Sequence, residues 1–344
     1  MRNVNRSGVL WCMLFIAAAG CVPVEYEDIP PQEKADRAMR QDYYGIWIQN
    51  ERNGFVVGSE GTLLVTQDGG QVWTPGYSGT TETLRDVRFD PEGRNGWIVG
   101  SSGAVLYSPS GGSGWLPSIS GTKETLNAVS EPIFDSRFGN FQLWAVGDRG
   151  TIIRSTDTGT TWLPAPVVTD ENLNDVSVMG PAESMTGWAV GNHGVILKTN
   201  GDGTLWLSQN SGTNEDLTSI FFVNEDNGWI VGDGGTILHM GPDRQFWTPV
   251  TNVGSGRFTD IFFSSTNPDC GWISGAGGQV LQTENGGQLW FPRDTQSRET
   301  LHSVFFIRPE DPVLCRDIGW AVGDGGTLIH SITGGIFWMN QFIR

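Results

Sequence analysis

Short apolar runs alternate with glycine-rich polar turns along most of this chain, and the same order of runs and turns recurs seven times. In each repeat, one apolar run begins with Gly-Phe, Gly-Trp or Leu-Trp, at residues 54, 96, 143, 187, 228, 271 and 319. Successive repeats are therefore 42, 47, 44, 41, 43 and 48 residues apart. Apolar runs rich in β-branched and aromatic residues between glycine turns predict strands. A strand-rich period of about 40 to 50 residues is typical of propeller blades.

Each repeat is predicted to hold four short strands. The first follows the pattern Leu-x-x-Val-x-Phe, as in 84–89, and 43–48 takes its place in the first repeat. The second is a Trp-Ala-Val-Gly or Trp-Ile-Val-Gly run, and a glycine turn such as 232–234 leads to the third. The fourth begins at a closing tryptophan, expected in the core: Trp73, Trp115, Trp162, Trp206, Trp247, Trp290 and Trp338.

We therefore predict an all-β fold, a seven-bladed β-propeller of four-stranded antiparallel blades that spans residues 43–344. A lone four-stranded sheet leaves both faces and both edges exposed, whereas a closed ring buries each sheet against its neighbours. The repeats begin with a first strand and end with a fourth, so no strand-swapped closure is evident. Residues 30–42 remain available to supply one.

The most specific local motif lies between the third and fourth strands. Residues 155–162, Ser-Thr-Asp-Thr-Gly-Thr-Thr-Trp, match an Asp box at every defining position, and 66–73 lack only the threonine before the tryptophan. The copy at 283–290 has Asn285 in place of the aspartate. We expect a hairpin in which Ser, Thr and Asp side chains bond backbone N–H groups while glycine permits the turn.

Several further signatures accompany the Asp box: Ser-Gly-Thr at 78–80, 120–122 and 211–213, the Gly-Trp-x-Val-Gly strand, and Gly-Thr-Ile-Leu before the box. Over about 300 residues the repeat resembles the photosystem II assembly and stability factor family of Asp-box (bacterial neuraminidase repeat) seven-bladed propellers. The resemblance implies an exported, often membrane-associated scaffold that binds proteins during assembly of a membrane complex. Photosynthetic members are associated with an arginine-rich patch, to which no residue of this chain can be assigned.

The first residues resemble an export signal. Arg2 and Arg6 precede an apolar segment at 9–19 that is too short to span a bilayer. It ends in Ala-Ala-Gly before Cys21, which resembles a bacterial lipobox; the alternative is an ordinary secretory signal cut nearby. We predict a signal peptide at 1–20, and a lipidated N-terminus at Cys21 with an acidic tether to residue 42. The protein is expected to be an extracytoplasmic, membrane-anchored lipoprotein, periplasmic or on the cell surface.

The charge is strongly negative, with a formal net charge of −17 for the whole chain. Without residues 1–20 it holds 19 basic against 38 acidic residues, a net charge of −19. Such a surface repels nucleic acid and anionic lipid, so neither is an expected partner. A basic protein such as a subunit of a membrane complex, a cation or a neutral glycan remains compatible, and we expect a monomer.

Two cysteines remain once Cys12 is assigned to the signal peptide and Cys21 to the lipid. Cys270 and Cys315 each stand just before a Gly-Trp, in the first inter-strand loop of the sixth and seventh repeats. Neighbouring blades carry these loops on one face, and an exported protein meets an oxidising compartment. The sequence leaves open a disulfide between them or two buried free thiols.

One set of acidic residues recurs across the repeats and is the candidate partner-binding site. Glutamates stand two residues before the first strand in five repeats: Glu82, Glu124, Glu171, Glu215 and Glu299. Aspartates in the turns between second and third strands are expected on the same face: Asp148, Asp233 and Asp324. A ring of carboxylates near the channel would attract cations or a basic partner segment. The alternative is a set of solvated loop acids that bond nearby backbone.

The sequence offers no catalytic constellation. Sialidase-like chemistry needs an arginine cluster and a tyrosine nucleophile, but the arginines are scattered and the five tyrosines lie in the tether, the first strand or the ring. His239 and His330 share a repeat position that other repeats fill with mixed residues, and no zinc-type spacing exists. We predict a non-enzymatic scaffold without metal or cofactor. The alternatives are a carbohydrate-binding or glycoside-processing surface protein and, third, a channel for a small ligand or cation.

Overall fold

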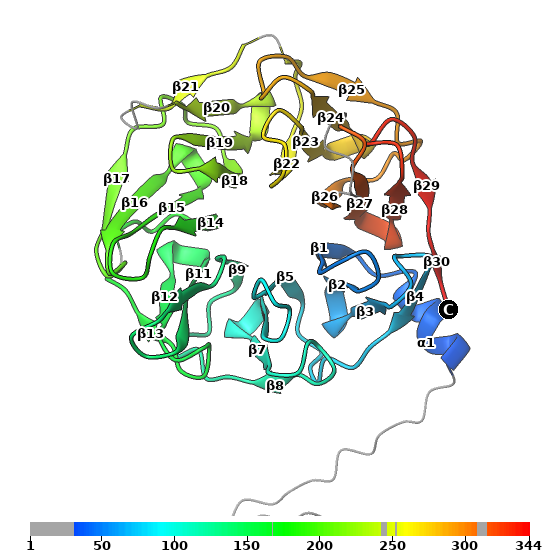
Figure 1. Ribbon diagram of the computed structural model, residues 1–344, viewed down its shortest axis with the longest axis horizontal. Coiled ribbons are helices and arrows are strands. Elements are labelled where there is room, and N and C mark those ends of the chain that lie inside the picture. The colour runs from blue at the N-terminus through cyan, green and yellow to red at the C-terminus, as the bar shows by residue number, and fades with distance from the viewer. Residues whose placement is uncertain (1–30, 167, 242–245, 252, 308–314) are drawn as a thin grey trace, which may run out of the picture.

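The computed structural model describes residues 31–166, 168–241, 246–251, 253–307 and 315–344. Seven antiparallel blades of four strands stand around a central channel, and the chain passes round the ring once (Figure 1), which confirms the predicted fold. The predicted signal peptide and Cys21 lie outside the described residues. Within those residues, no helix has the length and apolar character needed to cross a membrane.

The blades are numbered 1 to 7 in chain order. The innermost strands are β1 (Tyr43–Ile48), β5 (Leu84–Phe89), β9 (Leu126–Val129), β14 (Leu173–Met179), β18 (Leu217–Asn224), β22 (Phe258–Phe263) and β26 (Leu301–Ile307). The second strands are β2 (Gly54–Gly58), β6 (Gly96–Gly100), β11 (Asn140–Gly147), β15 (Met185–Gly191), β19 (Asn227–Gly232), β23 (Gly271–Gly275) and β27 (Ile318–Gly323).

The third strands are β3 (Leu63–Thr66), β7 (Val105–Ser108), β12 (Ile152–Ser155), β16 (Ile196–Gly201), β20 (Ile237–Met240), β24 (Val280–Thr283) and β28 (Leu328–Ser331). The outer strands are β4 (Val72–Pro75), β8 (Leu116–Pro117), β13 (Leu163–Pro164), β17 (Trp206–Gln209), β21 (Thr248–Pro249), β25 (Phe291–Arg293) and β29 (Met339–Asn340). Blade 3 differs because its inner strand breaks after β9, and β10 (Ile133–Asp135) continues the pairing with β11.

The apolar core lies between neighbouring blades. Trp144 of β11 is fully buried and packs in one cluster with Leu173 and Val176 of the next blade. Six of the seven closing tryptophans are buried, and Trp290 is partly buried. Because each sheet buries a face against the next one, stability comes from a cyclic series of interfaces rather than from one centre.

Tryptophans of the second strands also link neighbouring blades by hydrogen bonds. The indole N–H of Trp97 donates to the carbonyl of Thr158 over 3.0 Å, and that of Trp144 donates to Gly203 over 3.0 Å. Trp272 makes the same bond to the carbonyl of Gly334 over 2.9 Å. Each acceptor lies in the hairpin before the fourth strand of the following blade, so these hairpins hold the ring together as well as turning the chain.

The Asp box has the geometry that its residues predict. The Ser155 hydroxyl accepts the N–H of Gly159 over 2.9 Å, and Asp157 accepts the N–H and the hydroxyl of Thr161 over 2.9 and 2.6 Å. Gly159 adopts φ of +81°, a conformation that favours glycine. The indole of Trp97 lies against its Cα, so a side chain at this position would also collide with the ring.

The ring is closed by a strand from the end of the chain. β30 (Phe342–Ile343) pairs in parallel with β4 of blade 1, and the N–H of Arg344 donates to the carbonyl of Trp73 over 2.9 Å. This closure was not predicted, because two residues after the last repeat carry no strand pattern. Residues 31–42, the described part of the predicted closing segment, supply no strand. They still link the two ends of the propeller, because the Gly325 N–H of blade 7 donates to Asp42 over 2.9 Å.

The predicted tether is wrong for its second half. Residues Pro31–Ala38 form helix α1, which lies against β4 and β30 (Figure 1). Ala35 and Ala38 are buried, and the Tyr43 hydroxyl donates to the Ala38 carbonyl over 2.7 Å. The apolar face of this helix consists of small alanines three residues apart, which is why the acidic composition concealed it. Residues 21–30 of the tether lie outside the described residues.

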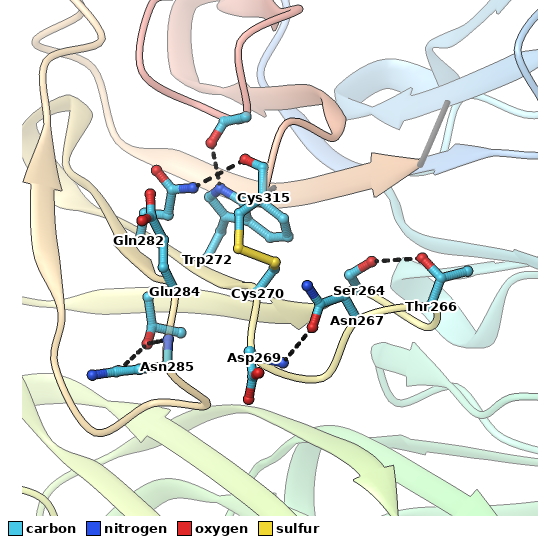
Figure 2. The surroundings of a disulfide bond; sticks show 12 residues. Ser264, Thr266, Asn267, Asp269, Cys270, Trp272, Gln282, Glu284, Asn285 and Cys315 are labelled. Carbon is cyan, nitrogen blue, oxygen red and sulfur yellow. Dashed lines mark hydrogen bonds between the residues drawn. A yellow bond between two sulfur atoms is a disulfide. The ribbon is translucent and has the colours of Figure 1, made fainter. Parts of the chain in front are cut away.

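Cys270 and Cys315 form a disulfide with a Cα–Cα distance of 5.5 Å, so the described structure favours the bridge over two free thiols. Figure 2 shows the bond beside Trp272, where it joins the loop before β23 to the loop before β27. Gln282 lies next to it and donates to the Cys315 carbonyl over 3.4 Å. The bridge therefore links blades 6 and 7 on the face that carries the Asp boxes.

Candidate functional site: the mouths of the central channel

The channel has one mouth on each face of the ring. One face carries the 3-10 turns between second and third strands and is called the turn face: η1 (Ser59–Gly61), η2 (Ser101–Gly103), η3 (Asp148–Gly150), η4 (Asn192–Gly194), η5 (Asp233–Gly235), η6 (Ala276–Gly278) and η7 (Asp324–Gly326). The opposite face carries the Asp boxes and is called the Asp-box face. Inner strands run from the turn face to the Asp-box face, so equal positions along them lie at equal depths in the channel.

The second residue of every inner strand lines a cavity of about 320 Å³ on the turn face. This turn-face mouth consists of Tyr44, Arg85, Asn127, Asn174, Thr218, Thr259 and His302. All seven are partly exposed, and all carry hydrogen-bonding groups. These seven residues were not predicted as a site, although alignment of the repeats places them one residue after the leading residue of each first strand.

Several of these side chains connect neighbouring inner strands, which are too far apart to pair by backbone. Asn127 donates to the carbonyl of Leu173 in the next blade over 2.9 Å, and Asn174 donates to Leu217 over 2.7 Å. Thr218 donates to Phe258 over 2.9 Å, and Thr259 bonds Leu301 in the same way. The inner wall is thus held from blade 3 to blade 7 by side chains.

The turn-face mouth contains charges of both signs. Arg85 lies over the ring of Tyr44, 4.5 Å from its centroid. Nε of Arg257 lies 3.4 Å from Asp233, and Nε2 of His302 lies 2.6 Å from Asp324. The mouth therefore offers cationic and anionic contacts side by side, rather than the uniform negative ring that the acidic residues alone suggested.

The predicted acids all lie on the turn face, around this mouth. Asp148 accepts from Asn127 over 3.1 Å, and Asp324 is hydrogen-bonded to His302 over 2.6 Å. Asp233 forms an ion pair with Arg257, with Nε 3.4 Å from the carboxylate. The five glutamates lie two residues before the inner strands of blades 2, 3, 4, 5 and 7. Glu215 and Glu299 are exposed. The structure thus brings the eight predicted acids to one face of the ring. They surround the turn-face mouth as its rim and do not line its cavity.

Three of the rim glutamates contact the middle residue of the turn in their own blade. Glu82 accepts from Ser102 over 2.9 Å, Glu171 lies 2.8 Å from Nδ1 of His193, and Glu124 lies 3.6 Å from Arg149. These turn residues have φ between 52° and 56°, a left-handed conformation that is costly outside glycine. The bond from Glu171 raises the pKa of His193. The glutamates therefore support strained turns as well as charging the rim.

A belt of carboxylates crosses the middle of the channel and was missed by the sequence analysis. Asp86, Asp175 and Asp260 occupy the third position of the inner strands of blades 2, 4 and 6. Each accepts a backbone N–H from the following blade, at Val129 over 3.0 Å and at Ile220 and Val304 over 2.9 Å. The sequence did offer one sign of this belt: an aspartate stands inside a predicted strand that is otherwise largely apolar. Arg88 is the cation of the belt, 3.0 Å from Asp86.

The belt makes stability depend on pH through Asp175. Burial raises the pKa of this carboxyl to about 7, against the effect of Arg88 and with a further rise from Asp260 and Asp86. The ordinary value in an unfolded chain is about 3.9. Because the folded pKa is the higher one, this group's contribution to the free energy of unfolding is fully present below about pH 4 and is lost as the pH rises to about 7.

We therefore expect the native chain to lose about 3 kcal/mol of unfolding free energy, relative to Asp175→Asn, between about pH 5 and about pH 8. Urea unfolding of both proteins at the two pH values measures the difference. Asp170→Asn, at an exposed position, serves as the control and should follow the native chain. If the unfolding free energies of the native chain and Asp175→Asn change equally with pH, the raised pKa of Asp175 is contradicted.

The mouth on the Asp-box face is aromatic on one side. The fifth residues of four neighbouring inner strands, Trp47, Phe221, Phe262 and Phe305, line a cavity of about 560 Å³ together with Glu131 and Ser177. We call it the aromatic mouth. Among the described residues, no group of three or more His, Cys, Asp and Glu side chains is placed to hold a metal ion. His239 and His330 lie outside the channel, stacked on Trp229 and Trp320.

Comparison with protein-family models finds a match to the family described as photosynthesis system II assembly factor YCF48. The match covers residues 29–119 and 161–253, which together make just over half of the chain. A search of curated protein sequences finds no significant match.

Solved structures share the fold at low sequence identity. A structure titled "YCF48 bound to D1 peptide" superposes with a TM-score of 0.67 at 22% identity, covering 86% of this chain and 92% of that one. YCF48 from Cyanidioschyzon merolae gives 0.63 at 18% identity, with 85% and 96% covered. Sqt1 of Saccharomyces cerevisiae gives 0.61 at 11% identity, again with 85% and 96% covered. At these identities the likeness establishes the fold alone.

Proposed function

Since this chain belongs to the family of photosynthesis system II assembly factor YCF48, we propose that it is a scaffold that binds protein partners while a membrane complex is assembled or stabilised. The observation that carries the proposal is the turn-face mouth, where polar side chains of seven inner strands converge on one cavity of about 320 Å³. The similar structure solved with a D1 peptide supports a polypeptide as the ligand. No catalytic role is proposed.

The partner that fits this face is a polypeptide with basic side chains. Glu215 and Glu299 on the rim are exposed and have no ion pair among the described residues, while the chain as a whole carries a net charge of −17. Arg85 and His302 on the floor supply donors for the carbonyl or carboxylate groups of the same segment. Charge complementarity of this kind promotes encounter and fixes orientation.

The place of action is part of the proposal. The basic leader, the short apolar segment and Cys21 support export and acylation of the mature N-terminus, which would hold the ring at a membrane surface. α1 begins at Pro31 and lies at the edge of blade 1, so the anchor would attach the ring by its side. Both faces of the ring would then remain open to partners.

The test is in-cell crosslinking and affinity purification of the tagged full-length protein from membranes, beside a variant with five glutamines in place of the rim glutamates. The substitutions are Glu82→Gln, Glu124→Gln, Glu171→Gln, Glu215→Gln and Glu299→Gln. We expect a captured partner to be lost or weakened about tenfold in the variant, and its binding to depend less on salt, because the exchanged charges are exposed.

The chain offers a matched control on the opposite face. Five exposed or half-exposed glutamates lie there, in loops between first and second strands or in an Asp box: Glu51, Glu92, Glu183, Glu225 and Glu284. Their conversion to glutamine changes the net charge equally and should leave capture intact. Equal loss in both variants would reject a turn-face site. If the native protein captures no protein at all, the scaffold is rejected, and glycan-array and hydrolase assays test the carbohydrate alternative.

A further inference from the structure

The aromatic mouth has a continuous wall of rings. Trp47 of blade 1 lies with its ring centroid 5.1 Å from that of Phe305 in blade 7, and Phe305 lies 4.9 Å from Phe262 in blade 6. Phe221 of blade 5 continues the series, 5.4 Å from Phe262. None of these four rings is buried in a blade core; all are partly exposed and line the cavity of about 560 Å³.

The lining of this cavity also includes acidic and polar residues. Glu131 and Ser177 line the same cavity, and the Glu131 carboxylate accepts from the Ser177 hydroxyl over 3.5 Å and from the Val178 N–H over 3.4 Å. Glu131 reaches the channel because the inner strand of blade 3 stops at Val129, before the Glu-Pro dipeptide at 131–132. Deeper in, a small cavity of about 60 Å³ is lined by Arg88, Glu131, Asp175 and Asp260 below the same rings.

Negative charge exceeds positive charge in this part of the channel. The carboxylates of Asp86, Asp175, Asp260 and Glu131 all act on the single guanidinium of Arg88. Arg88 is engaged with Asp86 at 3.0 Å and lies 5.8 Å from the centroid of the Trp47 ring. Asp175 and Asp260 accept only from neutral backbone N–H and serine hydroxyl groups, so their charge is not neutralised by an ion pair.

We propose that the aromatic mouth binds a lysine or arginine side chain of a partner polypeptide. The aliphatic stem would lie against Phe221, Phe262 and Phe305, and the cationic end would meet the ring faces and the carboxylates below. Arg88 already makes such an arrangement within the chain, with one carboxylate and one indole ring. The site goes beyond the proposed turn-face site, because it lies at the other end of the channel.

The chemistry favours a basic occupant over a purely apolar one. Aromatic faces attract cations, and the attraction grows when the cation is desolvated. An apolar group would cover the rings but leave Asp175, Asp260 and Glu131 in a drier cavity without a counter-charge, which is costly. Two further cationic side chains, Arg85 and His302, lie on the other side of the carboxylate belt, at the turn-face mouth. They contact Tyr44 and Asp324 there and therefore do not supply the missing counter-charge.

The experiment uses full-length protein with ¹⁵N-labelled tryptophan indoles, the Trp47 signal being identified by its loss in Trp47→Phe. Three probes differ only at the central residue: the N-acetylated, amidated pentapeptides Ala-Ala-Lys-Ala-Ala, its acetyl-lysine form and its norleucine form. We expect a saturable shift of the Trp47 indole signal with the lysine peptide at about tenfold higher affinity than with the other two.

Variants locate the contacts. Phe262→Leu keeps an apolar side chain but removes a ring, and Glu131→Gln removes one charge with little change of shape; each should weaken the lysine peptide about threefold or more. Binding should also strengthen from about pH 6 to about pH 8, because burial places the pKa of Asp175 at about 7. Asp170→Asn, at an exposed position, should change nothing.

Two results would overturn the proposal. Equal affinity for the lysine and norleucine peptides would mean that the cavity is only an apolar site. Absence of a saturable Trp47 shift with the lysine peptide, in protein whose other indole signals show the native fold, would mean that the cavity takes no basic side chain. Loss of partner capture through the rim glutamates has no bearing on either result, so the two proposals are tested separately.

Discussion

Replacement of Cys270 and Cys315 by alanine is expected to lower the free energy of unfolding by about 4 kcal/mol. The two residues are 45 positions apart in sequence, so the bond removes a large loop-closure entropy from the unfolded chain. The bond also ties the loop of blade 6 to that of blade 7, next to Trp272 and its bond to Gly334. Urea unfolding of the native chain and the double variant measures the loss.

Reduction provides the matching control for this prediction. The native chain, treated with a reductant until thiol titration shows two additional free thiols, should unfold at the same urea concentration as the double alanine variant. The variant itself should not respond to the reductant. If the reduced native chain is as stable as the oxidised one, the disulfide contributes nothing to the free energy of unfolding, and the prediction is wrong.

Asp260→Ala is expected to lower the free energy of unfolding by about 3 to 5 kcal/mol. The carboxylate accepts the N–H of Ile261 and of Val304 over 2.8 and 2.9 Å, and the hydroxyls of Ser219 and Ser303 over 2.9 Å each. The alanine leaves two backbone N–H groups at the blade interface without an acceptor, which costs about 1 to 3 kcal/mol each. Three inner strands lose their shared contact at once.

The belt gives this prediction a second readout. Asp260 helps to raise the pKa of Asp175, so Asp260→Ala should lower that pKa, which carboxyl ¹³C NMR can follow. Asp260→Asn retains one acceptor oxygen and should lose less stability than the alanine variant. Asp170→Ala, at an exposed position, is the control and should be near neutral. A loss below about 1 kcal/mol in Asp260→Ala would show that water replaces the carboxylate.

The number of blades and most of the strands could be predicted because the information is repeated and local. A tryptophan, two glycines and an apolar run recur at nearly constant spacing, and each occurrence supports the others. The parts that escaped prediction occur once. β30 is two residues long, and α1 buries only two alanines, so neither has a pattern that stands out from its surroundings.

The location of the acidic residues followed from equal positions in equal blades, but their chemical environment did not. Whether Glu171 is free or bonded depends on a histidine in the left-handed middle position of η4, and a sequence pattern does not give that geometry. Asp175 is surrounded by residues of other blades, including Ser219 and Ile220. Its raised pKa is a property of the closed ring, so it could be recognised only after the blades were placed together.

The parallel pairing of β30 with β4 places the two ends of the propeller in contact, with α1 lying beside both strands. Blade 1 therefore has neighbours on both sides, like every other blade, and only the order of the chain makes it the first. A circular permutation that joins residue 344 to residue 31 by a short linker, and opens the chain at the exposed turn 224–226, would keep every inter-blade contact. Such a permutant would separate the architecture of the ring from the position of its membrane anchor, which could then be moved from the side of blade 1 to the Asp-box face of blade 5.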